Sequence, residues 1–276
     1  MTSPGISADP DPLLLQRRKD GVAFLTLNRP AQYNALSEEM LAALQVAFEA
    51  LAADVSIRVV VLAGAGKAFC AGHDLKQMKA NPRLEYYQRL FEDCSRLMLQ
   101  IQALPQPVIA RVHGIATAAG CQLVAMCDLG LAADDARFAV SGVNVGLFCA
   151  TPSVALTRNV GRKAAFEMLV TGEFIDAPAA VQRGLINRSV PADHLDREID
   201  VLAAAIVAKP RAVIAAGKAL FYRQLELGVV PAYQLAGQAM ACNMMQAVAQ
   251  EGVAAFIERR APNWSGEGSA ESGPGG

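Results

Sequence analysis

The sequence predicts an α/β fold with a helical C-terminal part, and three observations support this prediction. Two segments, residues 59–76 and 107–128, each run from a short β-branched apolar stretch through a Gly/Ala-rich loop into residues with helical propensity. Beyond residue 151, apolar residues recur at helical spacing in segments separated by Gly, Pro or Asp-Ala-Pro. The length of 276 residues fits one globular domain with an appendage.

The first part of the chain is predicted to form a hairpin and then a helix. Two short apolar stretches between residues 13 and 28 flank Asp20 and Gly21, a pair that is typical of a tight hairpin turn. Ser37 is followed by two glutamates, so its hydroxyl is expected to cap a helix that continues to Leu51. A long helix is predicted over 83–103, with Tyr86, Tyr87, Phe91 and Met98 either lining a pocket or packing in an ordinary core.

The two small-residue loops predict a site for an oxygen atom that gains negative charge. The loop at 113–120 enters a helix whose first turn is expected at Ala119, and a helix start carries unpaired N–H donors and a partial positive charge. The loop at 63–73 repeats this design before a short helix at Asp74. One N–H group from each loop would hold the oxygen of an acyl group as it becomes an anion. Taken singly, each loop also fits a simple chain reversal.

Composition and missing motifs argue against several other classes of protein. A net charge of -1 and a pI of about 6.3 give no indication of a nucleic-acid partner. No apolar run approaches the roughly 18 residues that a membrane span needs. The AGAGK stretch at 63–67 lacks the Ser or Thr of a phosphate-binding loop, and dinucleotide-binding and serine-hydrolase motifs are absent as well.

Cysteine usage and surface character predict a location and an assembly. Six cysteines are scattered without a Cys-x-x-Cys pair, and the opening residues lack a secretion signal, so we expect reduced thiols in a cytoplasmic protein. A hydrophobic content of 53% and a mean hydropathy of +0.26 are high for a monomer and predict an apolar subunit interface.

Several ordered motifs run through the chain from about residue 13 to 264. They are LNRP at 27–30 with NAL at 34–36, AFCAGHDLK at 68–76, HG at 113–114, GCQL at 120–123, MCD at 126–128, TG at 171–172 and FIERR at 256–260. In this order and spacing they resemble the crotonase superfamily, also called the enoyl-CoA hydratase/isomerase family. The AGHDLK pattern combined with Gln122 is most similar to the enoyl-CoA hydratase domain-containing protein 3 group of that family.

The resemblance implies a crotonase-like spiral of ββα units, followed by a helical region that forms trimers or dimers of trimers. We therefore expect a spiral core at 13–200 and a helical oligomerisation region at 201–264, between a disordered lead-in at 1–12 and a disordered tail at 265–276. It also implies an acyl-CoA substrate in fatty-acid metabolism. No separate cofactor is expected because CoA is part of the substrate, and no metal, nucleic acid or membrane span is expected.

The same resemblance assigns residues to an oxyanion hole and to CoA binding. The two N–H groups of the hole fall on His73 and Ala119. The residues implied in CoA binding are Arg29, Ala71, His73, Asp74, Phe256 and Arg259. Arg29 could meet a phosphate or be solvated, and Asp74 could orient His73 or cap a helix. The His73 side chain is a candidate proton carrier because of its usual pKa range, or it faces solvent or CoA.

Two positions depart from the family pattern. Enoyl-CoA hydratases carry one glutamate in the turn of the second loop and another further along, where this chain has Gln122 and Gly142. A glutamine amide cannot accept a proton near neutral pH and glycine has no side chain, so ordinary hydration should lose roughly two to four orders of magnitude in rate. Ser141, Asn144 and Cys149 are the polar side chains near the second position. Asn144 could hydrogen-bond a thioester or a water, or serve a turn, and Cys149 is expected to be packed.

The leading expectation is an acyl-CoA enzyme of this family that stabilises a thioester oxyanion. Two alternatives remain open. The chain could use the oxyanion hole for another reaction, such as isomerisation or thioester cleavage, or it could bind acyl-CoA without catalysis as a partner of true hydratases.

Overall fold

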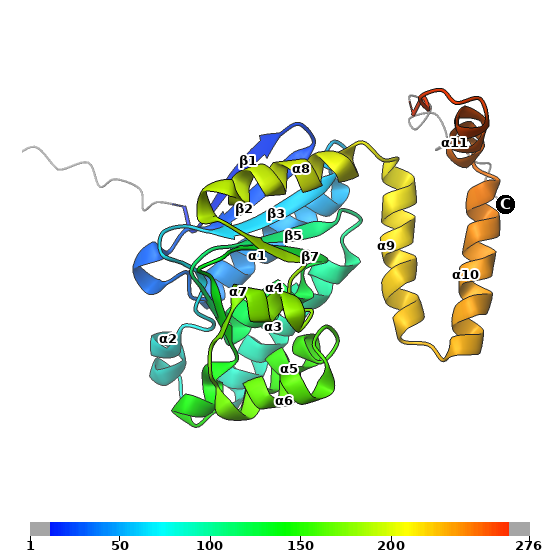
Figure 1. Cartoon of the computed structure of the whole chain (residues 1–276). Helices are drawn as coiled ribbons and strands as arrows, with labels where there is room; N and C mark the ends of the chain where they lie inside the picture. The colour runs from blue at the N-terminus through cyan, green and yellow to red at the C-terminus, as the bar shows by residue number, and fades with distance from the viewer. Residues whose placement is uncertain (1–11, 265–276) are drawn as a thin grey trace, which may run out of the picture.

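Two β-sheets form the centre of the molecule in a computed structural model that describes residues 12–264 (Figure 1). The larger sheet has the strand order β1-β2-β3-β5-β7-β10 and is parallel except for the β1–β2 hairpin. Its strands are β1 (Leu14–Lys19), β2 (Val22–Leu27), β3 (Val59–Gly64), β5 (Val108–Val112), β7 (Leu129–Ala133) and β10 (Arg188–Val190). The smaller sheet has β4 (Ala68–Cys70), β6 (Ile115–Thr117), β8 (Arg137–Ala139) and β9 (Ile175–Asp176). The predicted α/β fold is confirmed.

Helices cover both faces of the larger sheet, which explains its apolar strands. All six residues of β3 are buried, as expected for a parallel strand that packs on both sides. Val60 and Leu62 belong to the apolar cluster with α1 (Glu38–Ala53) and α3 (Leu84–Ala103). Val59 and Val61 alternate to the other face, where α8 (Leu195–Val207) covers them. The alternation follows from the two-residue repeat of a strand.

The turns and caps expected near the N-terminus are present. Asp20 and Gly21 have φ of 50° and 76°, the left-handed values that a tight hairpin turn between β1 and β2 requires. The Ser37 hydroxyl accepts a hydrogen bond from the N–H of Met40 at 3.2 Å and caps α1. The short helix expected at Asp74 is also present, as α2 (Leu75–Ala80), which begins directly after Asp74.

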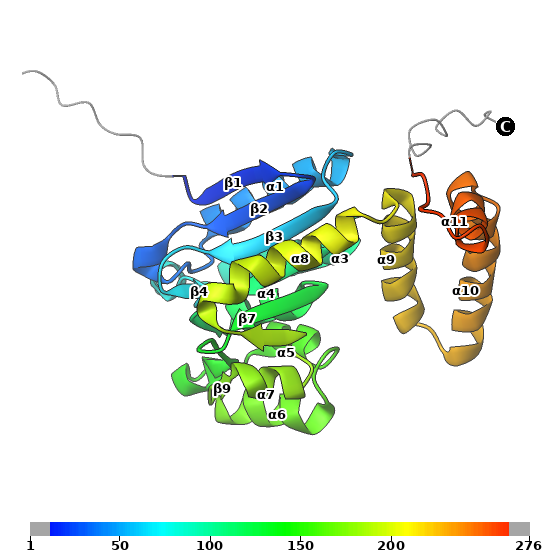
Figure 2. The same cartoon turned by 45° about the horizontal axis from the view of Figure 1, so that its top comes forward.

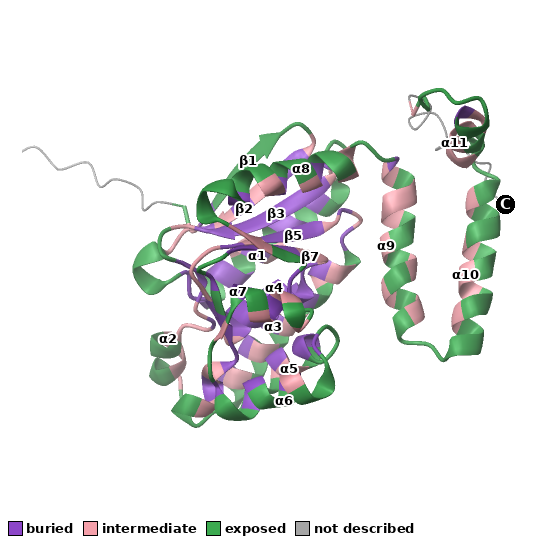
Figure 3. Ribbon diagram, viewed as in Figure 1, coloured by how far each residue is buried: buried purple, intermediate pink, exposed green. Residues whose placement is uncertain are grey.

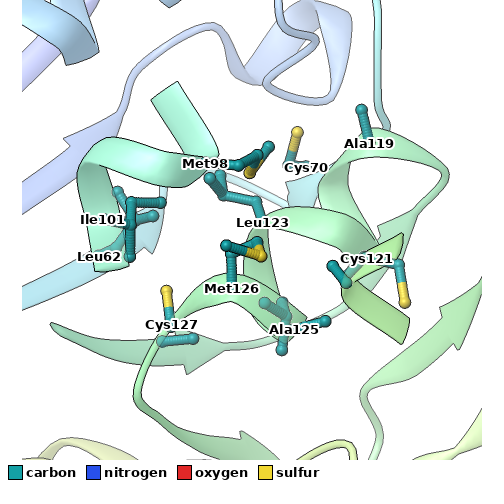
Figure 4. Packing of buried hydrophobic residues seen from close by; sticks show 14 of the residues in the cluster. Leu62, Cys70, Met98, Ile101, Ala119, Cys121, Leu123, Ala125, Met126 and Cys127 are labelled. Carbon is teal, nitrogen blue, oxygen red and sulfur yellow. The ribbon is translucent and has the colours of Figure 1, made fainter. Parts of the chain in front are cut away.

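The helix α4 (Ala119–Met126) is buried along its whole length and begins where the sequence predicts. Figure 4 shows its side chains in one apolar cluster with Cys70 of β4 and with Met98 and Ile101 of α3. Because every side of this helix is packed, its first turn is held in a fixed position. That first turn is one half of the candidate site.

The segment that contains Ser141, Asn144 and Cys149 includes two short pieces of helix. After β8 comes the 3-10 helix η2 (Ser141–Val145), and α5 (Ala150–Leu156) begins a few residues later. The remaining elements of the body are the 3-10 helices η1 (Pro30–Gln32) and η3 (Ala192–His194), and the helices α6 (Arg162–Thr171) and α7 (Ala177–Gln182). No helix within residues 12–264 has the length and apolar character needed to cross a bilayer.

The last three helices stand apart from the body, and we call them the C-terminal arm. They are α9 (Arg211–Leu225), α10 (Val229–Met244) and α11 (Ala247–Ile257), and Figures 1 and 2 show them projecting beside the sheets. No residue of α9 or α10 is buried (Figure 3). The arm begins at Arg211 rather than at 201, because α8 spans the expected boundary and buries Ile199 and Ala203 on the sheet. Apart from Pro12, the expected disordered ends lie outside the described residues.

An ion pair between side chains that are only 7% and 13% exposed joins the arm to the body. The Lys218 ammonium of α9 donates to Asp128 at 2.6 Å and to the carbonyl oxygens of Ile101 and Gln106 at 2.9 and 3.0 Å. The Tyr222 hydroxyl donates to the other oxygen of the Asp128 carboxylate at 2.7 Å. Burial lowers the pKa of Lys218, and the adjacent carboxylate opposes this shift. Every proton of the ammonium therefore has an acceptor, as a buried charge requires.

Candidate functional site

The N–H of His73 points away from the strand beside it. Leu36 donates to the carbonyl of Gly72 at 2.8 Å and accepts from the N–H of Asp74 at 3.3 Å, which is the pattern of a parallel bridge between Leu36 and His73. In such a bridge the two outer residues bond to the partner, and the N–H of the middle residue faces the opposite side. The His73 N–H is therefore directed to the other side of this loop.

The N–H of Ala119 is fixed by the residue before it. Ala118 has φ of 50° and ψ of -121°, donates its own N–H to Ala139 at 3.0 Å, and accepts at its carbonyl from Gln122 at 3.0 Å. Since Ala119 is the first residue of α4, its N–H has no acceptor within the helix. Both ends of Ala118 are held, so the direction of the Ala119 N–H is set by the fold.

Gly72 lets these two loops touch. A Cβ atom added at Gly72 would stand 2.9 Å from the Cβ of Ala118 and 3.2 Å from the nitrogen of Ala119, and the φ of Gly72 is +90°. Any larger residue would push the loops apart. The close approach brings the segments that carry the His73 and Ala119 N–H groups to the edge of one cavity.

This cavity has a volume of about 220 Å³ and an apolar lining. His73, Ala119, Gly142 and Cys149 all line it. The other residues around it are Ala71, Leu75, Met78, Phe91, Ala118, Ser141, Val145, Leu147, Phe148, Ala150, Thr151 and Pro152. None of these lining residues is a carboxylate. Of the four side chains that the sequence offered as pocket liners, Phe91 lines the cavity, whereas Tyr86 and Met98 are buried in the core.

The imidazole of His73 is buried and neutral. Both ring nitrogens are shielded from solvent and have no hydrogen-bond partner, and the ring meets Phe91 edge to face at a centroid distance of 5.5 Å. Burial lowers the pKa of His73 from 6.5 to about 4, and the nearby Leu36 carbonyl opposes this shift. At physiological pH the ring is therefore neutral, with one nitrogen that can donate and one that can accept.

The structure separates the two positions that lack a glutamate. Gln122 is only 4% exposed, its side-chain oxygen has no partner, and it does not line the cavity. Gly142 does line the cavity, and its N–H donates to the Cys149 sulfur at 3.3 Å. A Cβ at Gly142 would stand 2.3 Å from the Leu147 oxygen and 2.7 Å from the Cys149 sulfur. This backbone has no room for a side chain at position 142.

Cys149 was expected to be packed, and it is buried, but it also lines the cavity. Burial raises the pKa of its thiol, and the hydrogen bond from the Gly142 N–H opposes this shift. This placement could not be predicted, because the residues between Gly142 and Cys149 show no periodic pattern. Among residues 12–264 no group of three or more His, Cys, Asp or Glu side chains is placed to hold a metal ion.

Asn144, predicted near the reacting atoms, lies elsewhere. Its side chain is exposed, donates to the carbonyl of Gly172 at 3.2 Å, and does not line the cavity. The loop turns this side chain toward α6 and away from the oxyanion loops. The structure thus places the Asn144 side chain in a long-range contact with the end of α6 and outside the cavity.

Arg29 and Asp74 line a separate hollow of about 380 Å³. Asp74 accepts from the N–H groups of Lys76 and Gln77 at 3.0 and 3.2 Å, so it caps α2 and does not bond to the His73 ring. One nitrogen of Arg29 lies 3.4 Å from Asp74, and another is buried without a partner. Of the CoA-binding candidates, Ala71 and His73 line the 220 Å³ cavity and these two do not.

The two candidates near the chain end lie in or next to the C-terminal arm. Phe256 in α11 is 86% exposed, and Arg259 follows the end of that helix with φ of 56°. Neither lines the cavity of its own chain. Within one subunit, the structure does not bring them to the site.

Comparison with known proteins places this geometry among related chains. A family model described as enoyl-CoA hydratase/isomerase matches residues 17–267. A relative from Xenopus laevis, enoyl-CoA hydratase domain-containing protein 3, mitochondrial, is 44% identical over 254 residues, which are 92% of this chain and 86% of the relative. The group to which the sequence is most similar is therefore confirmed.

Solved structures agree with this result. A crystal structure of an enoyl-CoA hydratase from Mycobacterium smegmatis has a TM-score of 0.91 and 66% identity, and the match covers 92% of this chain and all of that one (100%). The structure of human enoyl-CoA hydratase domain-containing protein 3 has a TM-score of 0.89 and 43% identity, with coverage of 92% and 100%. The spiral α/β fold implied by the motifs is thus confirmed.

The comparisons correct the expected location. The five relatives from Xenopus, rat, mouse, human and zebrafish that share this name are all named as mitochondrial proteins. The predicted cytoplasmic location is wrong on this finding. Unpaired cysteines report that thiols are reduced, and they do not identify the compartment.

Proposed function

We propose that this chain, which belongs to the enoyl-CoA hydratase/isomerase family, binds the acyl group of an acyl-CoA in the 220 Å³ cavity. The thioester oxygen accepts hydrogen bonds from the N–H groups of His73 and Ala119. The observation that carries this proposal is the meeting of two free backbone donors, from two loops in contact, at an apolar cavity. An apolar lining suits an uncharged acyl chain.

Two such donors favour reactions that pass through an enolate or a tetrahedral anion. Each preorganised donor of this kind is worth about two to three orders of magnitude in rate. They act on the anion and leave the proton transfers to other groups. The cavity supplies no carboxylate, so the proposed reaction does not use the paired acid and base of ordinary hydration.

The neutral imidazole of His73 is the proposed proton carrier for isomerisation or thioester cleavage. His73 lines the cavity, and its ring nitrogens, which have almost no accessible surface, meet no hydrogen-bond criterion within residues 12–264, so the ring would have to turn toward the cavity to take a proton. Its pKa of about 4 makes it a weak base at neutral pH, which predicts slow turnover.

A second candidate function, acyl-CoA binding without turnover, is favoured by the same lowered pKa together with the absence of carboxylates among the lining residues. In that case the chain would act as an assembly partner of active hydratases. The two candidates share the same binding mode and differ only in chemistry.

The test measures binding, carbonyl polarisation and turnover in parallel. A chromophoric unsaturated acyl-CoA is titrated into the protein, and its absorbance is expected to shift to the red when the thioester oxygen accepts the two hydrogen bonds. Loss of the conjugated absorbance of short and medium enoyl-CoA reports hydration, and chromatography of the products reports isomerisation or cleavage. Gly72→Val is the matched variant, because its side chain separates the loops.

Each result has a distinct meaning. A red shift that Gly72→Val abolishes supports the oxyanion site, and turnover then separates the enzyme from the binding protein. Binding without a red shift contradicts the placement of the thioester oxygen. Hydration at the rates usual for enzymes, on the order of 1 to 1000 per second, contradicts the proposal that this cavity lacks an acid and base for water.

We further propose that the C-terminal arm mediates trimers or dimers of trimers. Its exposed apolar side chains support this assembly; the larger ones are Phe221, Leu225, Leu227, Val229, Val230, Tyr233, Met240, Met244, Met245, Val253, Phe256 and Ile257. In an assembly, Phe256 and Arg259 would reach the CoA of a neighbouring subunit. Sedimentation velocity measures the mass, and a monomer at all concentrations contradicts the proposal.

A further inference from the structure

We propose that the cavity selects unbranched, uncharged acyl chains of about six to eight carbon atoms, and that Phe91 is the side chain that limits this length. The inference rests on the acyl-CoA binding proposed above, with the thioester oxygen at the N–H groups of His73 and Ala119. It names the class of acyl group that this site takes, which the sequence motifs leave open.

The first argument is the capacity of the cavity, whose volume is about 220 Å³. An apolar cavity of about 150 Å³ takes up benzene, and a water molecule occupies about 30 Å³ in the liquid, so each non-hydrogen atom needs about 25–30 Å³. The cavity therefore has room for about seven to nine such atoms. One of them is the thioester oxygen, which leaves about six to eight for the carbon atoms of the acyl chain.

The second argument is the chemistry of the lining. Among residues 12–264, those that line the cavity include no Lys, Arg, Asp or Glu, and His73 is neutral at physiological pH. The hydroxyl groups are those of Ser141 and Thr151. A carboxylate at the far end of an acyl chain would meet no cation there, and burying an unpaired charge is costly. The cavity is therefore expected to discriminate against acyl groups of dicarboxylic acids.

The third argument is the way in which Phe91 is held in the cavity wall. Its ring stacks on Tyr87 of the same helix at a centroid distance of 6.4 Å and meets the His73 ring at 5.5 Å. The Tyr87 hydroxyl donates to the carbonyl of Met78 at 3.1 Å, which ties α3 to α2 beside a second lining side chain. These contacts oppose a movement of the Phe91 ring to make room for a longer chain.

The rim of the cavity determines what happens to longer chains. Val145, Leu147 and Phe148 line the cavity and are 64%, 45% and 48% exposed, so the cavity is open to solvent on this side. A chain that exceeds the capacity can leave through this opening, where its additional carbon atoms stay largely in water. Affinity should therefore rise with chain length up to about eight carbon atoms and then level off.

The experiment measures the Kd of a series of saturated acyl-CoA molecules by calorimetry, from butyryl-CoA to palmitoyl-CoA, below the concentrations at which they form micelles. Each added methylene group should tighten binding about fourfold, and this gain should end near octanoyl-CoA. Adipyl-CoA has as many acyl carbon atoms as hexanoyl-CoA but ends in a carboxylate. It should bind about a hundredfold or more weakly than hexanoyl-CoA.

Variants of Phe91 test which side chain limits the length. Phe91→Ala removes the phenyl ring and opens space for about six more atoms, so the gain should continue to about fourteen carbon atoms. Phe91→Leu removes about half as many atoms and should move the end of the gain by about three, which also provides a second variant if Phe91→Ala does not fold. Leu90→Ala is the matched control, because Leu90 precedes Phe91 in α3, is buried and does not line the cavity. It should lower stability and leave the length profile unchanged.

Several outcomes would overturn the inference. A gain in affinity that continues unchanged to palmitoyl-CoA contradicts the limited capacity, and a Phe91→Ala profile that ends where that of the wild type ends contradicts the role of Phe91. Adipyl-CoA that binds as tightly as hexanoyl-CoA contradicts the exclusion of charge. Equal affinity at all lengths with a normal red shift removes the selection and leaves the proposed function standing, whereas no binding of any acyl-CoA removes both.

Discussion

Placing a glutamate at both substituted positions, Gln122→Glu with Gly142→Glu, is expected to leave the chain without hydratase activity. The reason is steric. A Cβ at residue 142 would lie 2.3 Å from the Leu147 oxygen, whereas ordinary contacts begin at 3.4 Å, so the loop must open by about 1.1 Å, the difference 3.4 − 2.3. Overpacking of this kind typically costs about 1–3 kcal/mol in the free energy of unfolding.

Two single variants separate the steric effect at residue 142 from the effect of an added negative charge. Gly142→Ala adds only the Cβ and should lose the same 1–3 kcal/mol in urea unfolding, roughly 2–4 °C in melting temperature for each kcal/mol. Gln122→Glu alone is measured beside it, because Gln122 is only 4% exposed and a buried carboxylate there should lower stability by itself. The reasoning is refuted if Gly142→Ala unfolds like the wild type and the double variant hydrates crotonyl-CoA at enzymatic rates.

Three further predictions follow from the buried charges and the arm. Lys218→Met leaves the Asp128 carboxylate without its cation and should lower the free energy of unfolding by about 3–5 kcal/mol at fixed protein concentration. Adding Asp128→Asn should recover part of this loss of stability. An unfolding midpoint equal to that of the wild type for Lys218→Met would contradict the prediction. The pKa of His73, about 4, lies below its free value of 6.5, so the stabilisation linked to the neutral ring is complete above pH 6.5. The free energy of unfolding should fall by up to about 3 kcal/mol as the pH drops to 4. A difference in unfolding free energy between wild type and His73→Gln that does not change with pH would contradict the prediction. Tyr233→Glu with Met245→Glu changes two side chains that are 77% and 83% exposed and should shift sedimentation toward the monomer while leaving the circular dichroism of the body unchanged; an unaltered assembly would show that the arm makes no interface there.

Much of the fold could be predicted because many helices begin with signals that lie within a few residues in the sequence. Ser37 and Asp74 cap helices because their side chains reach N–H groups two or three residues ahead, and such spacing is visible in the letters. The start of α4 at Ala119 has no side-chain cap, and it is predictable because small residues precede a helical stretch. The packing between segments that are distant in the sequence leaves no short-range pattern from which it could be predicted. The sequence placed the end of the body at 200, whereas contacts with the sheet extend it through α8.

The candidate site likewise has parts that could be predicted from local sequence and parts that depend on contacts between distant residues. The two loops that carry the His73 and Ala119 N–H groups were predictable as strand-to-helix turns, because each contains its own small residues next to a strand. The filling of the space at Gly142 by Leu147 and Cys149 depends on how an irregular loop folds back on itself, and no periodicity reports that. The contact of Asn144 with the Gly172 carbonyl could not be predicted for the same reason, because this partner is distant in the sequence.

Ala118 sets the stability of the fold against the rigidity of one backbone donor. An alanine at φ of 50° and ψ of -121° is strained by about 1–3 kcal/mol, and a glycine would relieve that strain. Ala118→Gly should therefore raise stability while giving the peptide before Ala119 more freedom to rotate. The methyl group of Ala118 thus narrows the directions that the Ala119 N–H can take, at a cost to the stability of the whole chain.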